Sequence, residues 1–529
     1  MFSDESSRWD TFRALQGYIE RSSKRLIYWL LGILVIYVIA RGVAGAAARP
    51  FWFDELCTLA IAGQPTLREM WHAVARGFDS APPGFYLVER AALGLVSNKQ
   101  IALRLPSILA FPCILICVFE YVKKRSGEAI AFLCALLLLS TSLFHTYLIE
   151  ARAYSMVLAC IAFALVCYQR LPSVRWAALL GISFLVSESL HYYAIFAMVP
   201  FGCAEAVFLL RARQFRWPVW IALACGSLPL IVFWRLISAL KTVYGLHTFA
   251  RPVFSALPGY YGSFFLLPET AVAIPLTVVS VAAIVWSQLW PRDVTPRRNE
   301  SRDAGVAEGT LLLSLIALPY IVFALVCLVN GPLLSRYVLA AIFGVVVGMA
   351  CALSIAGRKA AVILALFGLC SVSMRELRFW RHPTYDPFVQ YSAATSAEQL
   401  SQMMQFVQSA GHEDLPVVVS DSQIYTQLVY YSPQLFANRL VYLVDERREL
   451  SYKRSDTSSK LMLALREFMP LGVTEYSEFT AAHREFLLYS GDADWYLAYL
   501  SQEAASVQLL AKASSGDLCL VKMKEGHPR

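Results

Sequence analysis

Charged residues are scarce in this chain of 529 residues. Lys, Arg, Asp and Glu together make up 16% of it, whereas hydrophobic residues make up 57%. An ordinary soluble protein is about one quarter charged, so the composition argues against that class. Apolar runs long enough to cross a bilayer recur up to about residue 375. The sequence therefore predicts a polytopic α-helical membrane protein.

The chain also lacks the cysteine patterns of a disulfide framework or a zinc site. Nearly all of its 12 cysteines lie inside apolar runs, and only Cys57 and Cys519 stand in aqueous-looking segments. We interpret the others as small apolar residues. The N-terminal segment 1–25 is polar and has no signal-peptide cleavage pattern. The first apolar run is therefore expected to remain as an anchor.

Basic residues are confined to short segments between the apolar runs, and this placement predicts the topology. Since positive residues favour the cytoplasmic side, segment 1–25 is expected inside as a cytoplasmic tail and the first long loop, 48–100, outside. The net charge of +8 follows from this placement and does not indicate nucleic-acid binding. Eleven spans fit one orientation. They are residues 26–47, 101–122, 128–147, 153–169, 176–190, 194–210, 217–237, 270–290, 310–329, 335–356 and 360–375.

The composition changes to a soluble pattern at about residue 376, which divides the chain into a membrane domain, 26–375, and a C-terminal domain, 376–529. The expected strands of the second domain are residues 416–420, 439–445, 486–489 and 517–521. Because helical stretches alternate with these strands, a small α/β domain is predicted. It has no glycine-rich phosphate loop, so we favour an accessory or acceptor-guiding role over nucleotide-sugar binding.

The outer loop 48–100 carries an acidic pair, Asp54-Glu55, behind an aromatic cluster. A carboxylate held among aromatic rings at a membrane surface can accept a proton in catalysis. The simpler alternative is that both acids solvate a helix end. The pattern Thr66-Leu67-Arg68-Glu69 predicts a helix cap and a short helix on the membrane. Asp79 opens a rigid Pro-Pro turn, so the whole loop is expected to form a structured platform.

Further polar residues stand at the outer ends of the spans. Glu150-Ala151-Arg152 joins two spans, Glu188 and His191 share one helical face, and Arg336 begins a span. Ionisable residues at membrane depth are costly and are functional candidates. Structural ion pairs or snorkelling arginines are the alternative for each. All of them are expected on the side where Asp54 lies, which favours one common site.

These motifs resemble a known signature. The residues that carry it are Phe53-Asp54-Glu55, Asp79-Ser80-Ala81-Pro82-Pro83 with Tyr86, Arg104-Leu105-Pro106-Ser107, Glu150-Ala151-Arg152-Ala153-Tyr154, His191-Tyr192-Tyr193 and Arg336-Tyr337. In this order they resemble the GT-C glycosyltransferases, above all the branch that contains protein mannosyltransferases and aminoarabinose transferases. The resemblance spans residues 45–375. It implies a GT-C fold with a sugar donor linked to polyprenyl phosphate.

The resemblance also implies roles for individual residues. Asp54 matches the general base of an inverting transfer, with Glu55 and Asp79 as its acidic partners. Cations must stabilise the phosphate leaving group, and Arg152, Arg336 and Arg104 are the expected ones. The expected lining of the sugar or lipid pocket is Tyr154, His191, Tyr192 and Tyr193.

Some members of this superfamily use a divalent metal cation, and here its expected ligands are Glu55, Asp79 and His191, although their spacing is not diagnostic. The expected partners are a lipid-linked sugar donor, membrane lipid, and a glycan, lipid or protein acceptor. The expected location is the bacterial inner membrane, with the active site and the C-terminal domain on the periplasmic side. A flippase for lipid-linked sugars and a non-catalytic scaffold are the alternatives. A flippase would be expected to have polar sites near the membrane midplane and internal repeats, and the sequence shows neither clearly.

Overall fold

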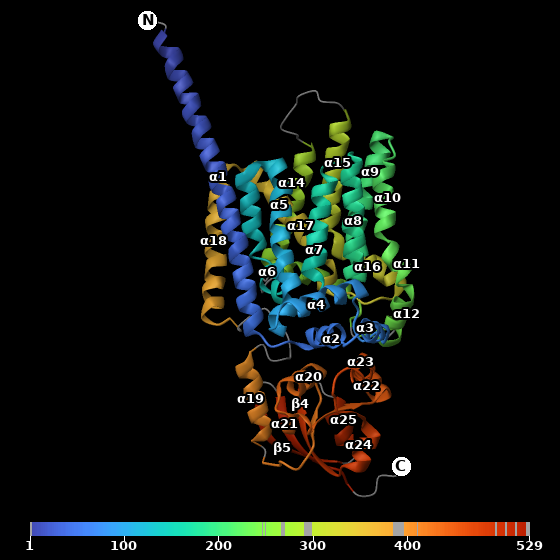
Figure 1. Ribbon diagram of the computed structural model, residues 1–529. Helices are drawn as coiled ribbons and strands as arrows, with labels where there is room; N and C mark the ends of the chain where they lie inside the picture. Colours follow the sequence, from blue (N-terminus) through green and yellow to red (C-terminus); the bar gives the residue numbers. More distant parts are fainter. Residues whose placement is uncertain are drawn as a thin grey trace.

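The computed structural model describes residues 3–245, 247–248, 250–265, 270–289, 299–383, 396–409, 411–491, 495–502, 505–513 and 516–524. It consists of a body of long helices and a smaller C-terminal α/β domain below it (Figure 1). The helices of the body are α1 (Ser3–Ala48), α5 (Lys99–Leu138), α7 (Tyr154–Tyr168), α8 (Val174–Leu190), α9 (Ile195–Ala212), α10 (Trp217–Gly226), α11 (Leu228–Val232), α12 (Trp234–Val243), α14 (Thr270–Leu289), α15 (Asn299–Ile316), α16 (Leu318–Val329), α17 (Ala341–Ala356) and α18 (Arg358–Arg381). Short elements between them are α6 (Ser142–His145), η1 (Tyr147–Ile149), η2 (Tyr192–Ala194), η3 (Phe254–Ala256), α13 (Leu257–Phe264) and η4 (Ser335–Val338).

Each of the eleven predicted spans falls on one or more of these helices. The second and third spans share α5, which breaks at Gly127, where φ is +82°. The seventh and ninth spans are bent: α10 and α11 meet α12 at 57°, and α15 meets α16 at 67°. By length and composition, three helices in the described part of the chain can cross a membrane, or up to five if each bent pair counts once. The count of eleven remains a prediction.

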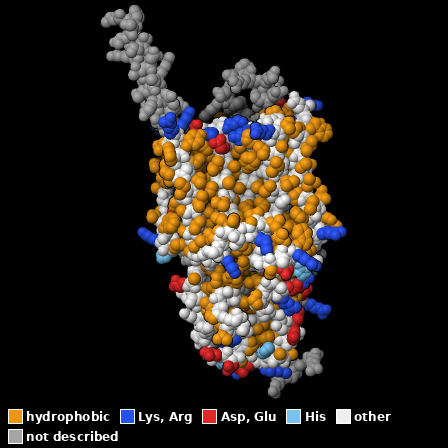
Figure 2. All heavy atoms as spheres, in the orientation of Figure 1, with side chains coloured by type: hydrophobic (Ala, Val, Ile, Leu, Met, Phe, Trp, Pro, Cys, Tyr) orange, Lys and Arg blue, Asp and Glu red, His pale blue; other side chains and the backbone are white. Residues whose placement is uncertain are grey.

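An apolar belt covers the face of the helical body that Figure 2 shows. Large apolar side chains face outward on it, for example Trp29 at 73% and Ile36 at 69% exposure on α1. A surface of this kind is stable in lipid and would aggregate in water. Lys and Arg side chains gather along the end farthest from the C-terminal domain (Figure 2). The fold is thus that of a polytopic membrane protein with one strongly basic end.

The outer loop forms a platform of three helices, α2 (Phe53–Ala62), α3 (Leu67–Ala75) and α4 (Pro83–Leu95), across the opposite end of the body (Figure 1). The predicted cap of α3 is confirmed. The Thr66 hydroxyl accepts from the Glu69 N–H at 3.2 Å, and the Glu69 carboxylate accepts from the Thr66 N–H at 2.9 Å. On α3 the apolar side chains are divided, with Met70 buried and Trp71 48% exposed. The exposed part is suited to a lipid surface.

Gly84 allows the platform to pack closely against the helical body. A Cβ atom at this position would lie 2.4 Å from the carbonyl oxygen of Ser189, near the end of α8. We expect Gly84→Ala to lower the free energy of unfolding by about 1–3 kcal/mol, because a backbone atom would have to move. Gly94→Ala on the same helix is the control, since its Cβ would have no neighbour within 4 Å. Equal thermal unfolding midpoints for the two variants in nanodiscs would contradict this.

The C-terminal domain contains a six-stranded sheet in the order β3-β2-β1-β4-β6-β5. Its strands are β1 (Val417–Val419), β2 (Leu440–Val444), β3 (Val473–Glu475), β4 (Glu485–Ser490), β5 (Ser506–Ala513) and β6 (Gly516–Lys522). The first four are parallel, and β6 and β5 are antiparallel additions. The surrounding helices are α19 (Ala397–Gln408), α20 (Ser422–Tyr431), α21 (Gln434–Ala437), α22 (Glu446–Lys453), α23 (Thr457–Leu465), α24 (Tyr476–Ala482) and α25 (Trp495–Gln502). The predicted α/β class and all four predicted strands are present, while β3 and β5 were not predicted.

The predicted domain boundary at residue 376 falls inside α18, which continues to Arg381. Glu376 itself is 7% exposed and lies against α1, which supplies partners for one of its carboxylate oxygens. Tyr37 donates a hydrogen bond to its carboxylate at 2.5 Å, and Arg41 lies 3.4 Å from it. Neutralised in this way, a carboxylate can remain in the helical body.

The two domains meet at the platform. Gln427 of α20 donates to the carbonyl of Phe51 at 2.8 Å, and the Phe51 N–H donates to the hydroxyl of Tyr431 at 2.7 Å. Both contacts lie only a few residues before Asp54. The soluble domain thereby fixes the backbone that enters α2, so it is part of the surroundings of the acidic pair.

Candidate functional site

A cavity of about 930 Å³ lies between the helical body, the platform and the C-terminal domain. This is large enough for a sugar with part of its carrier or acceptor. Six predicted site residues line it, and they come from α2, the platform turn, the start of α7, η2 and η4. These residues are Asp54, Asp79, Arg152, Tyr192, Tyr193 and Arg336. Segments that are far apart in the sequence therefore converge on one site.

Asp54 stands in the first turn of α2, at the cavity wall. Its side chain is 20% exposed, and its Oδ2 lies 3.4 Å from a guanidinium nitrogen of Arg336. Its backbone carbonyl accepts from the hydroxyl of Thr58 at 3.0 Å. The carboxylate thus combines access to the cavity with a fixed backbone, as a proton acceptor requires.

Asp79 and Arg152 form a buried bidentate ion pair, with nitrogen–oxygen distances of 2.6 and 2.8 Å. Burial raises the pKa of Asp79, but the charge and hydrogen bonds of Arg152 outweigh it, so the pKa lies below its usual value. Asp79 is therefore ionised and satisfied. Arg152 also reaches the hydroxyl of Thr58 at 3.2 Å and the carbonyl of Asp54 at 3.4 Å. This pair positions a guanidinium beside Asp54.

Glu55 and Arg104 form a second bidentate pair, at 2.7 and 2.6 Å, and both residues are 1% exposed. Arg104 also donates to the backbone carbonyls of residues 46, 49 and 50. Glu55 accepts from the N–H groups of Trp52 and Ala151. Neither residue lines the cavity. The geometry gives this pair a structural role, in place of the acidic-partner and phosphate-binding roles that the resemblance implied.

Breaking this second pair should cost stability. We expect Glu55→Gln to lower the free energy of unfolding by about 3 kcal/mol, because it leaves the Arg104 charge buried without a counter-charge. Glu413→Gln, at an exposed position, is the charge-matched control. Thermal unfolding in nanodiscs measures the effect. If Glu55→Gln kept full stability and lost only activity, Glu55 would belong to the catalytic machinery after all.

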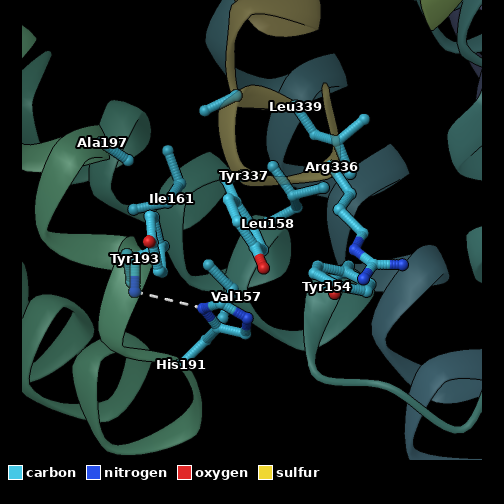
Figure 3. Close-up of a pocket in the computed structure, with 12 residues that line it drawn as sticks. Tyr154, Val157, Leu158, Ile161, His191, Tyr193, Ala197, Arg336, Tyr337 and Leu339 are labelled. Carbon is cyan, nitrogen blue, oxygen red and sulfur yellow. Dashed lines mark hydrogen bonds between the residues drawn. The ribbon is translucent and has the colours of Figure 1, made fainter. Parts of the chain in front are cut away.

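Arg336 connects the large cavity with a small slot of about 30 Å³. Besides Arg336, the slot is lined by Tyr154, His191, Tyr193 and Tyr337 (Figure 3). The rings of Tyr193 and Tyr337 stack at 4.0 Å between centroids. The Nε of Arg336 is buried and has no hydrogen-bond partner among the described residues. A cation with an unused donor at an apolar slot is suited to a phosphate on a lipid chain.

His191 is neutral in this site, and its tautomer follows from one hydrogen bond. Its Nδ1 accepts from the backbone N–H of Tyr193 at 3.1 Å (Figure 3). Burial, together with the charges of Arg152 and Arg336, lowers the pKa of His191 to about 3. The proton of the neutral ring must then sit on Nε2, which has no partner within the described chain. The hydroxyl of Tyr192 is likewise buried and unpartnered.

The lowered pKa of His191 predicts a pH effect on stability. Between pH 6.5 and about 3 the unfolded chain binds a proton here and the folded chain does not. The free energy of unfolding therefore falls as the pH drops through that window. From pH 7 to pH 5 this residue should contribute a loss of about 2 kcal/mol. His191→Gln should remove that loss in thermal unfolding of the variant against wild type. Parallel pH curves for the two proteins would contradict the prediction.

The expected metal ligands do not converge on one point. The described residues contain no group of three His, Cys, Asp or Glu side chains placed to hold a metal ion. The Glu55 and Asp79 carboxylates are already held by arginines, and His191 uses Nδ1 for a backbone contact. A cation bound by these three residues does not fit this arrangement.

Several residues in and around the cavity could not be found from the sequence. Thr58 joins Asp54 to Arg152, and Tyr244 donates to the carbonyl of Phe78 at 2.9 Å. Glu449 and Lys453 line the cavity from the C-terminal domain, and no local pattern distinguishes them from ordinary surface residues.

Comparison with known proteins identifies the fold of the chain. No family model and no curated protein sequence matches the chain. Solved structures do match it. The structure of ArnT from Cupriavidus metallidurans bound to undecaprenyl phosphate aligns with a TM-score of 0.52 at 14% identity, covering 95% of this chain and 99% of the other.

Two further structures align less well. The apo state of the same ArnT aligns with a TM-score of 0.45 at 14% identity, covering 96% of this chain and 98% of the other. The Archaeoglobus fulgidus oligosaccharyltransferase complex with Zn and sulfate aligns with a TM-score of 0.39 at 11% identity, covering 84% of this chain and 64% of the other. The first alignment carries the fold assignment, since its TM-score exceeds 0.5 and it covers nearly all of both chains. ArnT is an aminoarabinose transferase of the GT-C superfamily. The chain therefore has the GT-C fold, as its ordered motifs predicted.

Proposed function

We propose that this protein is a membrane glycosyltransferase that moves a sugar from a polyprenyl-phosphate carrier to an acceptor hydroxyl. The observation that carries the proposal is the arrangement of Asp54 between two guanidinium groups, those of Arg336 and Arg152, at a cavity that joins an apolar slot. A base beside a cluster of phosphate-binding cations is what such a transfer needs. The ArnT structure of the same fold holds undecaprenyl phosphate.

The reaction is an inverting displacement. The acceptor oxygen attacks the anomeric carbon of the donor sugar, and Asp54 takes the proton of that hydroxyl. The bond from the anomeric carbon to the phosphate oxygen breaks, and its electron pair leaves with the lipid phosphate. Arg336 and Arg152 stabilise the developing charge. When the donor binds, its phosphate competes for Arg336 and releases Asp54 from their 3.4 Å contact.

The orientation follows from charge. The basic end of the helical body (Figure 2) favours the cytoplasm. The platform, the cavity and the C-terminal domain then lie on the outer face, which in a bacterial inner membrane is the periplasmic side. The division into a membrane domain, 26–375, and a C-terminal domain, 376–529, and the eleven spans belong to the same proposal. The donor sugar is a pentose or a hexose, and the carrier is of the undecaprenyl type.

A flippase for lipid-linked sugars would use the same ligand, so the test must separate chemistry from transport. Wild-type protein in liposomes is given undecaprenyl-phosphate-linked pentoses and hexoses that carry a radiolabel in the sugar, together with a cell-envelope extract that supplies acceptor hydroxyls. The proposal predicts that label leaves the lipid while free undecaprenyl phosphate accumulates. Label that crosses the bilayer with the lipid intact would overturn the proposal in favour of transport.

A further inference from the structure

The C-terminal domain forms one complete wall of the cavity, and the reaction leaves that wall without a role. Residues from α20, α22 and α23 line it, among them Gln423, Glu449 and Lys453. The cations proposed for the donor phosphate all come from the helical body. A displacement with inversion requires the acceptor to approach from the side opposite to the leaving phosphate. The C-terminal domain lines the cavity with residues that are separate from the helical body, which supplies these cations.

Glu449 has an unused hydrogen-bond acceptor at this wall. The residue is 1% exposed, and its Oε2 accepts from the backbone N–H of Ser459 at 2.9 Å. Its Oε1 is buried and has no hydrogen-bond partner among the described residues. A buried carboxylate oxygen without a partner is costly. A ligand that donates a hydrogen bond to it would remove that cost.

Gln423 of α20, which also lines the cavity, has an unused hydrogen-bond acceptor as well. Its side-chain carbonyl oxygen is also buried and unpartnered within the described chain. Lys453, one helical turn after Glu449 on α22, is exposed and takes part in no ion pair in the same residues. The wall therefore offers two oxygens that accept and one ammonium group that donates. Hydroxyl groups, which both donate and accept, complement such a set.

Aromatic side chains also line the cavity, namely Trp52, Tyr192 and Tyr244. An aromatic surface facing polar side chains fits a sugar ring, which has apolar C–H faces and a polar rim. A polypeptide acceptor would instead be expected at a sheet edge or in an apolar groove. None of the described residues on this wall belongs to a strand.

We propose that Glu449 and Gln423 form an acceptor subsite that binds a saccharide through its hydroxyl groups. This inference rests on the proposed function and identifies the acceptor as a carbohydrate. It also gives the C-terminal domain a direct part in acceptor recognition. Glu449 is a binding residue in this scheme and takes no part in the proton transfer to Asp54.

The test uses the full-length protein in nanodiscs and saturation-transfer NMR. The probes are the methyl glycosides of glucose, galactose and N-acetylglucosamine, and a capped peptide rich in Ser and Thr. Wild-type protein should transfer saturation to the ring protons of at least one glycoside. Glu449→Gln keeps an oxygen for Ser459 but presents an N–H to the cavity, so it should weaken that binding at least tenfold. Gln423→Leu should weaken it as well.

Glu446→Gln is the matched control, because it makes the same charge change at an exposed position of α22 outside the cavity. It should bind the glycoside like wild type. The inference is overturned if Glu449→Gln also binds like wild type, if no glycoside binds to wild type, or if the peptide alone binds. Release of labelled sugar from the donor is followed separately. A wild type that consumes no donor contradicts the proposed function, whereas normal consumption with unchanged glycoside binding in Glu449→Gln contradicts this inference only.

Discussion

Asp54→Asn is expected to lower the rate of sugar transfer about 10³-fold while leaving the binding of undecaprenyl phosphate nearly unchanged. Asparagine has the shape of aspartate but cannot accept the proton of the acceptor hydroxyl, and a positioned general base contributes about 10²–10⁴ in rate. The residue lies at the cavity wall, 3.4 Å from Arg336. Because the substitution leaves the phosphate-binding arginines in place, the effect should appear in kcat and only weakly in the donor KM.

The matched control for this variant is Asp414→Asn, which alters an exposed carboxylate of the C-terminal domain. It should transfer sugar at the wild-type rate. Asp79→Asn makes an informative comparison, because it releases Arg152 from its bidentate pair and should raise the donor KM. If Asp54→Asn transfers sugar within twofold of wild type, Asp54 is not the base.

Arg336→Ala is expected to lower kcat by about 10²–10³ and to weaken the binding of undecaprenyl phosphate. The loss of one charge-stabilising donor from a transition state has an effect of this size. Arg336 is suited to the role because its Nε is buried without a partner in the described part of the chain. Its guanidinium also lies 6.0 Å from the rings of Tyr154 and Tyr337, which hold it at the mouth of the slot.

Arg336→Lys should fall between wild type and Arg336→Ala, since lysine keeps the charge but lacks the planar set of donors. Arg235→Ala is the control. Arg235 lies on α12, which contributes to the same cavity, but it is exposed and does not line it. Steady-state transfer and equilibrium binding of radiolabelled undecaprenyl phosphate measure both effects. Equal values for Arg336→Ala and Arg235→Ala would remove Arg336 from the site.

Much of this molecule could be predicted from the sequence, for physical reasons that particular segments show. The apolar runs identify the long helices, because a helix in lipid must be apolar for its whole length. The capping box at Thr66 and Glu69 marks the start of α3 because it satisfies backbone groups locally. The parallel strands β1, β2 and β4 are buried and read as continuous apolar runs. In contrast, β3 has three residues and β5 is a partly exposed edge strand, so neither has a strong pattern.

The division of roles inside the acidic pair could not be predicted. Asp54 and Glu55 are neighbours in the sequence, but neighbours on a helix point about 100° apart. Asp54 therefore faces the cavity, while Glu55 faces the buried side, where Arg104 meets it. Arg104 and Arg152 also look alike in the sequence, since each stands in a polar motif at the end of a predicted span. Only the tertiary contacts separate the arginine that holds the platform from the one beside Asp54.

The most direct test of this account is the position of the donor phosphate in a cryo-EM structure. The protein is Asp54→Asn in nanodiscs with an undecaprenyl-phosphate-linked sugar bound, so that the donor is not consumed. We expect phosphate oxygens within hydrogen-bond distance of Arg336 and Arg152, with the sugar in the 930 Å³ cavity facing the C-terminal domain. A phosphate bound elsewhere, such as at the basic end of the helical body, would contradict it.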